Sequence, residues 1–232
     1  MARHVHRVKV AALTEQMPVP EAELRHLHVM RLRPGDTVQV FDGGGEVGEA
    51  ELLSLDTLSA QLRLLSRRTA TAEYPQSVTL AVALLKGDKL ADVVRAGSEL
   101  GAAAFQLLRT RYGDVPDIGD NKLGRLRRVA EEAARQSQRA VVPAVLAPVP
   151  LTGYDPAGQV FYAHPGSPVR LLDVLTWAAP VTLISGPEGG FAPEDLAHLS
   201  AIGATPITLG PRILRAETAP LALLGALAAS GV

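Results

Sequence analysis

The sequence contains no cysteine and no long apolar run, and these absences exclude several kinds of protein. Without cysteine, the chain can form neither a disulfide framework nor a thiolate metal site. Its six histidines lack the spacing of a metal site, so we expect no metal. No apolar run approaches the roughly 18 residues of a membrane span, and no apolar segment follows the basic N-terminus as in a secretory signal. We therefore expect a cytoplasmic protein with no membrane association.

What the chain does contain is ample apolar material and balanced charge. The 232 residues are 47% hydrophobic, which is sufficient for one large or two small packed domains. The net charge of −1 does not by itself predict a nucleic-acid partner. One segment is locally basic, with Lys122, Arg125, Arg127, Arg128, Arg135 and Arg139 against only Glu131 and Glu132. It is either an RNA-facing patch or a solvated helix face with internal ion pairs.

Residues 1–70 have the pattern of a small β-rich unit. Strand-like segments at 37–41, 49–53 and 60–65 are separated by turn residues, and Asp42-Gly43-Gly44-Gly45 predicts a hairpin turn. His26 and His28 are expected on a strand or turn. Residues 67–75 have no apolar period and are the expected linker.

Residues 75–232 alternate between strand-like and helical segments, which predicts an α/β domain with a mainly parallel sheet. Strands are expected at 78–85, 104–108, 159–162, 181–184 and 205–209, and helices after Asp88 and at 122–139, 169–178 and 193–199. The segment 221–229 is apolar on every side, so we expect a fully buried helix and, because a terminal helix normally keeps one wet face, an oligomer interface.

The segment 43–48 matches the GxGxxG pattern of dinucleotide-binding proteins. That pattern binds phosphate only where a helix begins inside it. Strand-like residues follow here instead, so we interpret the match as a hairpin rather than a cofactor site.

Two glycine-rich segments each follow a strand-like run near the C-terminus, at 183–191 and 209–219. Glycine allows the backbone to turn tightly and to approach a ligand closely. Two such loops at the carboxyl edge of a parallel sheet would form a pocket for a small cofactor. The alternatives are a tight turn without a ligand for the first segment, and a structural ion pair among Arg212, Arg215 and Glu217 for the second.

The sequence GPEGGF at 186–191, followed by LGPRILRAETA at 209–219, resembles the bacterial 16S ribosomal RNA uridine-N3 methyltransferases of the SPOUT superfamily. The resemblance implies a SPOUT domain at 75–232 with a deep trefoil knot and a mainly parallel sheet, preceded at 1–70 by a small β-barrel, PUA-like RNA-binding domain. It also implies S-adenosylmethionine as methyl donor, a homodimer, and 16S rRNA of the small ribosomal subunit as partner. The implied reaction is methylation at N3 of uridine 1498, in the usual RNA numbering.

The resemblance also implies the site residues. Those expected to bind the cofactor are His164, Ile184, Gly186, Pro187, Glu188, Gly190, Leu209, Gly210, Ile213, Leu214, Arg215 and Thr218. Uracil N3 must lose a proton before it can attack a methyl group, so we expect Arg215 to stabilise the resulting anion. Glu217 either orients Arg215 or accepts the proton. His164 either faces the cofactor or is a satisfied polar core residue.

The chain departs from the family pattern at Ala96, Arg135 and Gln138, where the family usually has Lys, Glu and Gly. These positions are expected on the RNA-facing side, so they bear on the choice of substrate more than on the methyl donor. Two alternative functions therefore stay open. One is a SPOUT methyltransferase acting elsewhere, such as on a tRNA ribose 2′-hydroxyl, and the other is a non-catalytic RNA-binding assembly factor.

Overall fold

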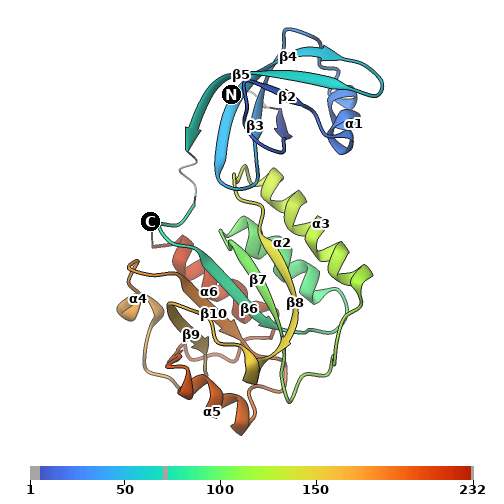
Figure 1. Cartoon of the computed structure of the whole chain (residues 1–232). Helices are drawn as coiled ribbons and strands as arrows, with labels where there is room; N and C mark the ends of the chain where they lie inside the picture. Colours follow the sequence, from blue (N-terminus) through green and yellow to red (C-terminus); the bar gives the residue numbers. More distant parts are fainter. Residues whose placement is uncertain (1–5, 70–72, 231–232) are drawn as a thin grey trace. The chain divides into compact units, whose positions relative to one another are not determined.

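The computed structural model describes residues 6–69 and 73–230 (Figure 1). The chain divides into two compact units, one made of residues 1–73 with 138–142 and the other of residues 74–137 with 143–232. The prediction of a linker at 67–75 is wrong for its first three residues, because residues 67–69 form the end of a strand. Residues 70–72 of that expected linker lie outside the described residues.

The first unit is a curled five-stranded sheet in the order β1 (Arg7–Lys9), β3 (Thr37–Phe41), β4 (Glu46–Leu55), β5 (Ala60–Thr69), β2 (Gln16–Pro18). The pairing of β1 with β3 is parallel and the other pairings are antiparallel. The expected hairpin turn is confirmed, since Asp42 Oδ1 accepts hydrogen bonds from the amides of Gly44 at 2.7 Å and Glu46 at 3.1 Å. The GxGxxG match therefore runs into β4, and no helix begins inside it.

Helix α1 (Glu21–Val29) covers this sheet and was not expected from the sequence. It contains His26 and His28, so their placement on a strand or turn is wrong. The helix is short and its apolar stripe is limited to Leu24 and Leu27, which are both buried in the core of the unit. Two apolar residues three apart are too few to stand out as a helical period.

Residues 138–142 complete the first unit from the middle of the chain. Ala140 and Val142 pack with Phe41 and Val47. The Arg139 guanidinium, with a side chain 3% exposed, is held by the Glu73 carboxylate through Nε and Nη2. Arg139 is thus an interior ion-pair partner and is not part of an exposed basic patch.

The second unit contains a six-stranded, all-parallel sheet, as expected for an α/β domain. Its order is β11 (Thr205–Ile207), β9 (Gln159–Ala163), β10 (Val181–Ser185), β6 (Val78–Ala83), β7 (Ala104–Arg109), β8 (Ala144–Pro150). Both edge strands carry proline, Pro206 in β11 and Pro148 in β8, where a missing backbone donor is tolerated. Strand β8 was not expected, because its prolines obscure the strand pattern. The trefoil knot stays a prediction, since strand order and register do not describe how the chain threads.

Helices cover both faces of this sheet. Helix α2 (Lys89–Glu99) packs against α3 (Asp120–Gln136) and α6 (Thr218–Ala228) on one face, while α5 (Pro193–Ala201) and the 3-10 turn η1 (Leu151–Gly153) contact each other on the opposite face. Neighbouring strand residues alternate between the two cores, as Leu183 and Ile184 do. This double covering explains the continuous apolar run of β6.

Two helix expectations differ from the structure. Of the helix expected at 169–178, only α4 (Leu171–Val174) forms, so the prediction is wrong for the rest of that range. Beyond α4, Gln159 Oε1 accepts hydrogen bonds from the Thr176 amide at 2.9 Å and from the Thr176 hydroxyl at 3.0 Å. Helix α6 is not buried on every side within one chain. Its residues Leu223, Leu224 and Leu227 are buried, whereas Leu221, Ala222, Gly225 and Ala226 are only partly covered.

Candidate functional site

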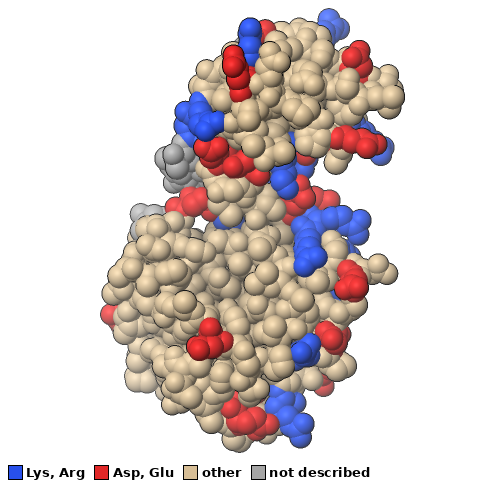
Figure 2. Space-filling model, viewed as in Figure 1, with Lys and Arg blue, Asp and Glu red and all other residues tan. Residues whose placement is uncertain are grey.

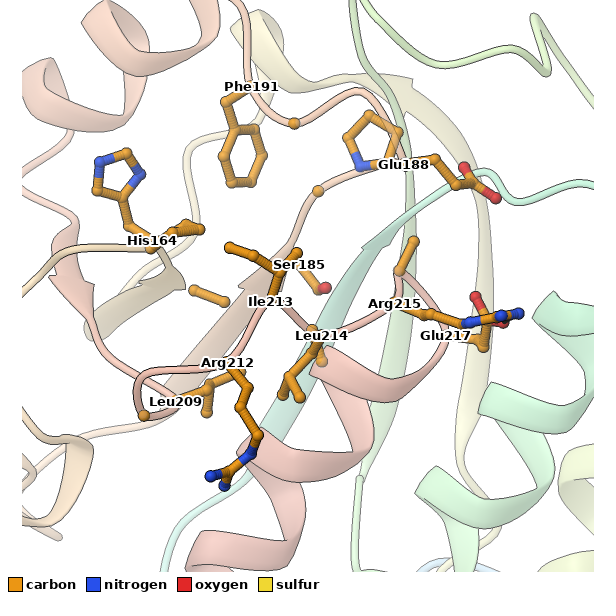
Figure 3. A pocket seen from close by; sticks show the side chains of 18 of the residues that line it. His164, Ser185, Glu188, Phe191, Leu209, Arg212, Ile213, Leu214, Arg215 and Glu217 are labelled. Atoms are coloured by element: carbon orange, nitrogen blue, oxygen red, sulfur yellow. Dashed lines mark ion pairs between the residues drawn. The ribbon is translucent and has the colours of Figure 1, made fainter.

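The carboxyl ends of three neighbouring strands meet at one cavity of about 680 Å³. Strands β9, β10 and β11 end at Ala163, Ser185 and Ile207, and because all three are parallel their ends share one edge of the sheet. Both glycine-rich segments line this cavity (Figure 3). The two loops anticipated from the sequence are therefore brought together, with the end of β9 between them.

The first loop runs from Ser185 at the end of β10 to the start of α5. Gly190 has a φ of +73°, and its amide donates to the Pro187 carbonyl at 3.0 Å, which closes a tight turn. The Phe191 ring lies against Gly186, where an added Cβ would come within 3.1 Å of it. Glycine at this position thus allows the aromatic ring to form part of the cavity wall.

Helix α5 begins directly after this loop at Pro193, although its N-cap residue has no side-chain acceptor. Ala192 occupies the N-cap position, and the Asp195 carboxylate accepts a hydrogen bond from the Ala192 amide at 3.0 Å. Half of a capping box is therefore present, and Pro193 at the first helical position favours the start.

The second loop runs from Leu209 to α6. Gly210 has a φ of +93°, and its amide donates to Thr208 Oγ1 at 3.1 Å. Ile213 and Arg215 are largely exposed, at 81% for the residue and 84% for the side chain respectively. The Arg215 carbonyl accepts from the amides of Thr218 and Ala219, which joins the loop to the first turn of α6.

The two acidic residues of the cavity lie on one side of it, together with Arg215. Figure 3 shows Glu188, Arg215 and Glu217 on one side, His164 and Phe191 on the other, and Arg212 pointing away from the acidic pair. The separation gives the cavity a polar side and a mainly apolar side.

Lys89, at the start of α2, connects the acidic residues of the two loops. Its Nζ lies 3.2 Å from Glu188 Oε1 and 3.2 Å from Glu217 Oε2. Arg215 Nη1 lies 4.0 Å from Glu217 Oε1. The hydrogen bond to Glu188, followed by the ion pair with Glu217, raises the pKa of Lys89. A hydrogen bond from the backbone amide of Glu217, together with the contact with Lys89, lowers the pKa of Glu217.

Most of the expected site residues line the cavity. They are His164, Gly186, Pro187, Glu188, Gly190, Leu209, Gly210, Ile213, Leu214, Arg215 and Glu217. Two do not: Ile184 is fully buried in the core between the sheet and α5, and Thr218 is exposed at the start of α6. Because β10 alternates faces, the last strand residues before the loop cannot all reach the cavity.

The sequence analysis missed several lining residues: Lys89, Ala163, Pro165, Ser185, Phe191, Leu196, Ala216 and Ala219. Phe191 ends the GPEGGF segment and was available as a signal. Lys89 lies 99 residues before Glu188 and 128 residues before Glu217, so only the fold brings it to the two loops. Among the described residues, no group of three metal-ligating side chains is present.

The basic segment of α3 is largely engaged with neighbouring groups. Arg125 lies 2.7 Å from Asp88, Arg127 donates to the Val145 carbonyl at 3.1 Å, and Arg135 lies 3.6 Å from Glu131 one turn earlier. Figure 2 shows basic side chains gathered over α3 with acidic ones beside them. The internal ion pairs expected under one of the two interpretations are thus present. No helix in the described part of the chain is long and apolar enough to cross a membrane.

The chain is similar to known proteins over nearly its whole length. Residues 72–228 match the model of an RNA methyltransferase domain, and residues 19–65 match that of an RNA methyltransferase PUA domain. The ribosomal RNA small subunit methyltransferase E of a Synechocystis species is 38% identical over 213 residues, covering 88% of this chain and 69% of that protein. The protein of that name from Mycobacterium tuberculosis is 32% identical over 210 residues, covering 85% and 80%.

Two solved structures are similar to this chain over nearly its whole length. The ribosomal RNA small subunit methyltransferase E of Neisseria gonorrhoeae, bound to S-adenosyl methionine, superimposes with a TM-score of 0.87 at 28% identity and covers 98% of both chains. A Legionella pneumophila protein described as a putative methyltransferase, in complex with the same cofactor, gives 0.84 at 26% identity, again covering 98% of both.

Proposed function

Because the chain belongs to the ribosomal RNA small subunit methyltransferase E family of SPOUT proteins, we propose that it methylates N3 of one uridine in 16S ribosomal RNA, using S-adenosylmethionine. In the usual RNA numbering this is uridine 1498. The observation that carries the proposal is the cavity at the ends of β9, β10 and β11, where two glycine-rich loops meet an exposed arginine and a glutamate.

The residues of the cavity fit S-adenosylmethionine. The volume of about 680 Å³ lies within the usual range of roughly 300–1,000 Å³ for small-molecule sites. Leu209, Ile213 and Leu214 offer an apolar wall, and the glycines at 186, 190 and 210 leave the backbone free to approach a ligand. When bound, the cofactor supplies an electrophilic methyl group.

The polar side of the cavity suits the substrate. Uracil N3 becomes nucleophilic when its proton leaves to solvent water, which reaches this exposed side of the cavity, and the negative charge then spreads to the neighbouring oxygens. We assign to Arg215 the stabilisation of this charge, because its exposed guanidinium is free to contact a base at the cavity rim. Glu217, whose pKa is lowered, is a poor proton acceptor at neutral pH. We therefore assign it the orientation of Arg215.

The remaining parts of the proposal concern assembly and partners. The first unit, which matches the PUA model, would supply RNA affinity. The partly covered face of α6 formed by Leu221, Ala222, Gly225 and Ala226 would pack against a second copy, giving a homodimer. A cytoplasmic location follows from the proposed substrate, since small ribosomal subunits are assembled there.

Nucleoside analysis by mass spectrometry tests the proposal directly. 16S ribosomal RNA from a strain lacking the gene should lose N3-methyluridine, and a plasmid-borne copy should restore it. Loss of a tRNA 2′-O-methylnucleoside instead would assign a different RNA site. Unchanged modifications together with defective subunit assembly would identify a non-catalytic assembly factor.

A further inference from the structure

Lys89 occupies a helix position that is unfavourable for a cation. It is the first residue of α2, where the helix dipole places partial positive charge. The N-cap residue Asp88 makes no capping hydrogen bond, and its carboxylate lies 2.7 Å from Arg125 instead. Asp92, the acidic residue of the first turn, lies 2.8 Å from Arg95, so the carboxylates paired with Lys89 are those of Glu188 and Glu217, outside the helix.

The neighbouring lysine in the sequence is engaged elsewhere. Lys86 Nζ lies 2.8 Å from Asp114, outside the cavity lining. Lys89, in contrast, lines the cavity and holds one carboxylate from each glycine-rich loop, both at 3.2 Å. The side chains of Lys89, Glu188 and Glu217 are 36%, 33% and 25% exposed, so all three charges remain partly in contact with solvent.

Removing the ammonium would leave two carboxylates at one cavity, with Arg215 as the remaining cation that the described residues place within 4.0 Å of either of them. The carboxylates would repel each other, and the loops that carry them would separate. Glu217 would also lose the contact that fixes one of its oxygens, and Arg215 would become its remaining charged neighbour. A carboxylate that is no longer held in place cannot orient the guanidinium toward an anionic base.

Lys89 itself is not suited to proton transfer. Its two acidic partners raise its pKa above the usual value, so it stays charged through neutral pH and cannot accept a proton there. Its contribution must therefore be made through the groups that it holds.

We propose that Lys89 is a positioning residue for methyl transfer: it joins the two glycine-rich loops through Glu188 and Glu217 and keeps Glu217 oriented toward Arg215. This inference rests on the proposed function, because it assigns Lys89 a role in the same reaction. It extends that function to a third segment of the chain, the start of α2.

The test compares Lys89→Met with Lys89→Arg, using full-length protein and small ribosomal subunits that lack the modification. At saturating cofactor, Lys89→Met should lower the single-turnover rate about tenfold, and Lys89→Arg should retain most of the rate. Arg170→Met is the matched control, because it removes an exposed cation paired with Asp173 away from the cavity. It should leave the rate unchanged.

A double variant asks whether Lys89 acts through Glu217. If it does, adding Lys89→Met to Glu217→Gln should lower the rate by less than about twofold more. A wild-type rate for Lys89→Met, or losses that multiply in the double variant, would overturn the positioning role.

Calorimetry without RNA separates this inference from the proposed function. Titration with S-adenosylhomocysteine should show affinity about three- to tenfold weaker for Lys89→Met, and near wild type for Lys89→Arg. If the wild-type protein binds this ligand but does not methylate the subunit, the proposed function fails and the calorimetric comparison alone decides whether Lys89 holds the loops. Unchanged affinity in Lys89→Met, or no binding by the wild type, would overturn the inference.

Discussion

Replacing Arg215 by alanine should separate catalysis from folding. The Arg215 side chain is 84% exposed, and its one acidic neighbour, Glu217, is 4.0 Å away. An exposed ion pair at this distance contributes little to stability. For a chain of 232 residues, its loss should therefore change the melting temperature little.

The expected effect on the reaction is much larger. If the guanidinium stabilises negative charge that develops as uridine loses its N3 proton, its loss should slow methyl transfer by about 10²–10³, equivalent to roughly 2.7–4 kcal/mol. Single-turnover methylation of unmodified small subunits, measured at saturating cofactor, gives this rate. The affinity of Arg215→Ala for S-adenosylhomocysteine, measured by calorimetry, should be nearly that of the wild type. Its mass in light scattering should also be unchanged.

The pH dependence of the same rate provides a sharper test. Alkaline pH should partly rescue Arg215→Ala, because more uridine ionises without help. Glu217→Gln should be slowed and partly rescued in the same way, because uridine that has already ionised no longer depends on groups that assist the loss of its proton. Arg212→Ala is the control, because it removes the same charge from the same loop. Its methylation rate should fall much less than that of Arg215→Ala. Wild-type rates for Arg215→Ala at every pH would refute the assignment.

Four further predictions concern two backbone positions, assembly and domain integrity. Gly210→Ala should weaken cofactor binding about tenfold in calorimetry, because its φ of +93° strains any other residue by roughly 1–2 kcal/mol. Gly124→Ala, in α3 with no atom within 4 Å of the added Cβ, should instead stabilise the protein by about 0.5–1 kcal/mol in denaturant unfolding. Ala226→Glu should reduce the mass in light scattering from twice 24.4 kDa to 24.4 kDa, because it places a charge on the apolar face of α6. A fragment of residues 1–73 should be less stable by about 2 kcal/mol than the same fragment with residues 138–142 appended, since those residues cover Phe41 and Val47. Equal thermal melting of the two fragments would contradict this last prediction.

The sequence alone was sufficient for the features that depend on local pattern. The run from Val78 gives a strand covered on both faces, because β6 lies inside the sheet and both faces are apolar. The hairpin at Asp42 follows from a side chain that binds the amides of its own turn. Both are decided within a few residues, which is the range over which residue spacing carries information.

Local pattern failed where a distant contact outweighed it. The helix expected beyond Val174 does not form, because the Gln159 side chain, in β9, accepts a hydrogen bond from the amide of Thr176. Helix α1 has too few apolar residues to be evident, yet it is stabilised by burying Leu24 and Leu27 against a sheet. Residues 138–142 belong to the first unit because Arg139 forms an ion pair with Glu73, which lies 66 residues earlier in the sequence.

The same division applies to the functional site. The sequence by itself determined the two glycine-rich loops, because they are continuous segments that follow strands. The family resemblance that these loops carry then implied most of the residues that line the cavity. Only the tertiary structure decided that Ile184 turns away from the cavity, that Thr218 lies outside it, and that Lys89 joins Glu188 to Glu217. The physical reason is distance along the chain: an ion pair between residues about a hundred positions apart has no periodicity and exists only once a parallel sheet has brought its strand ends to one edge.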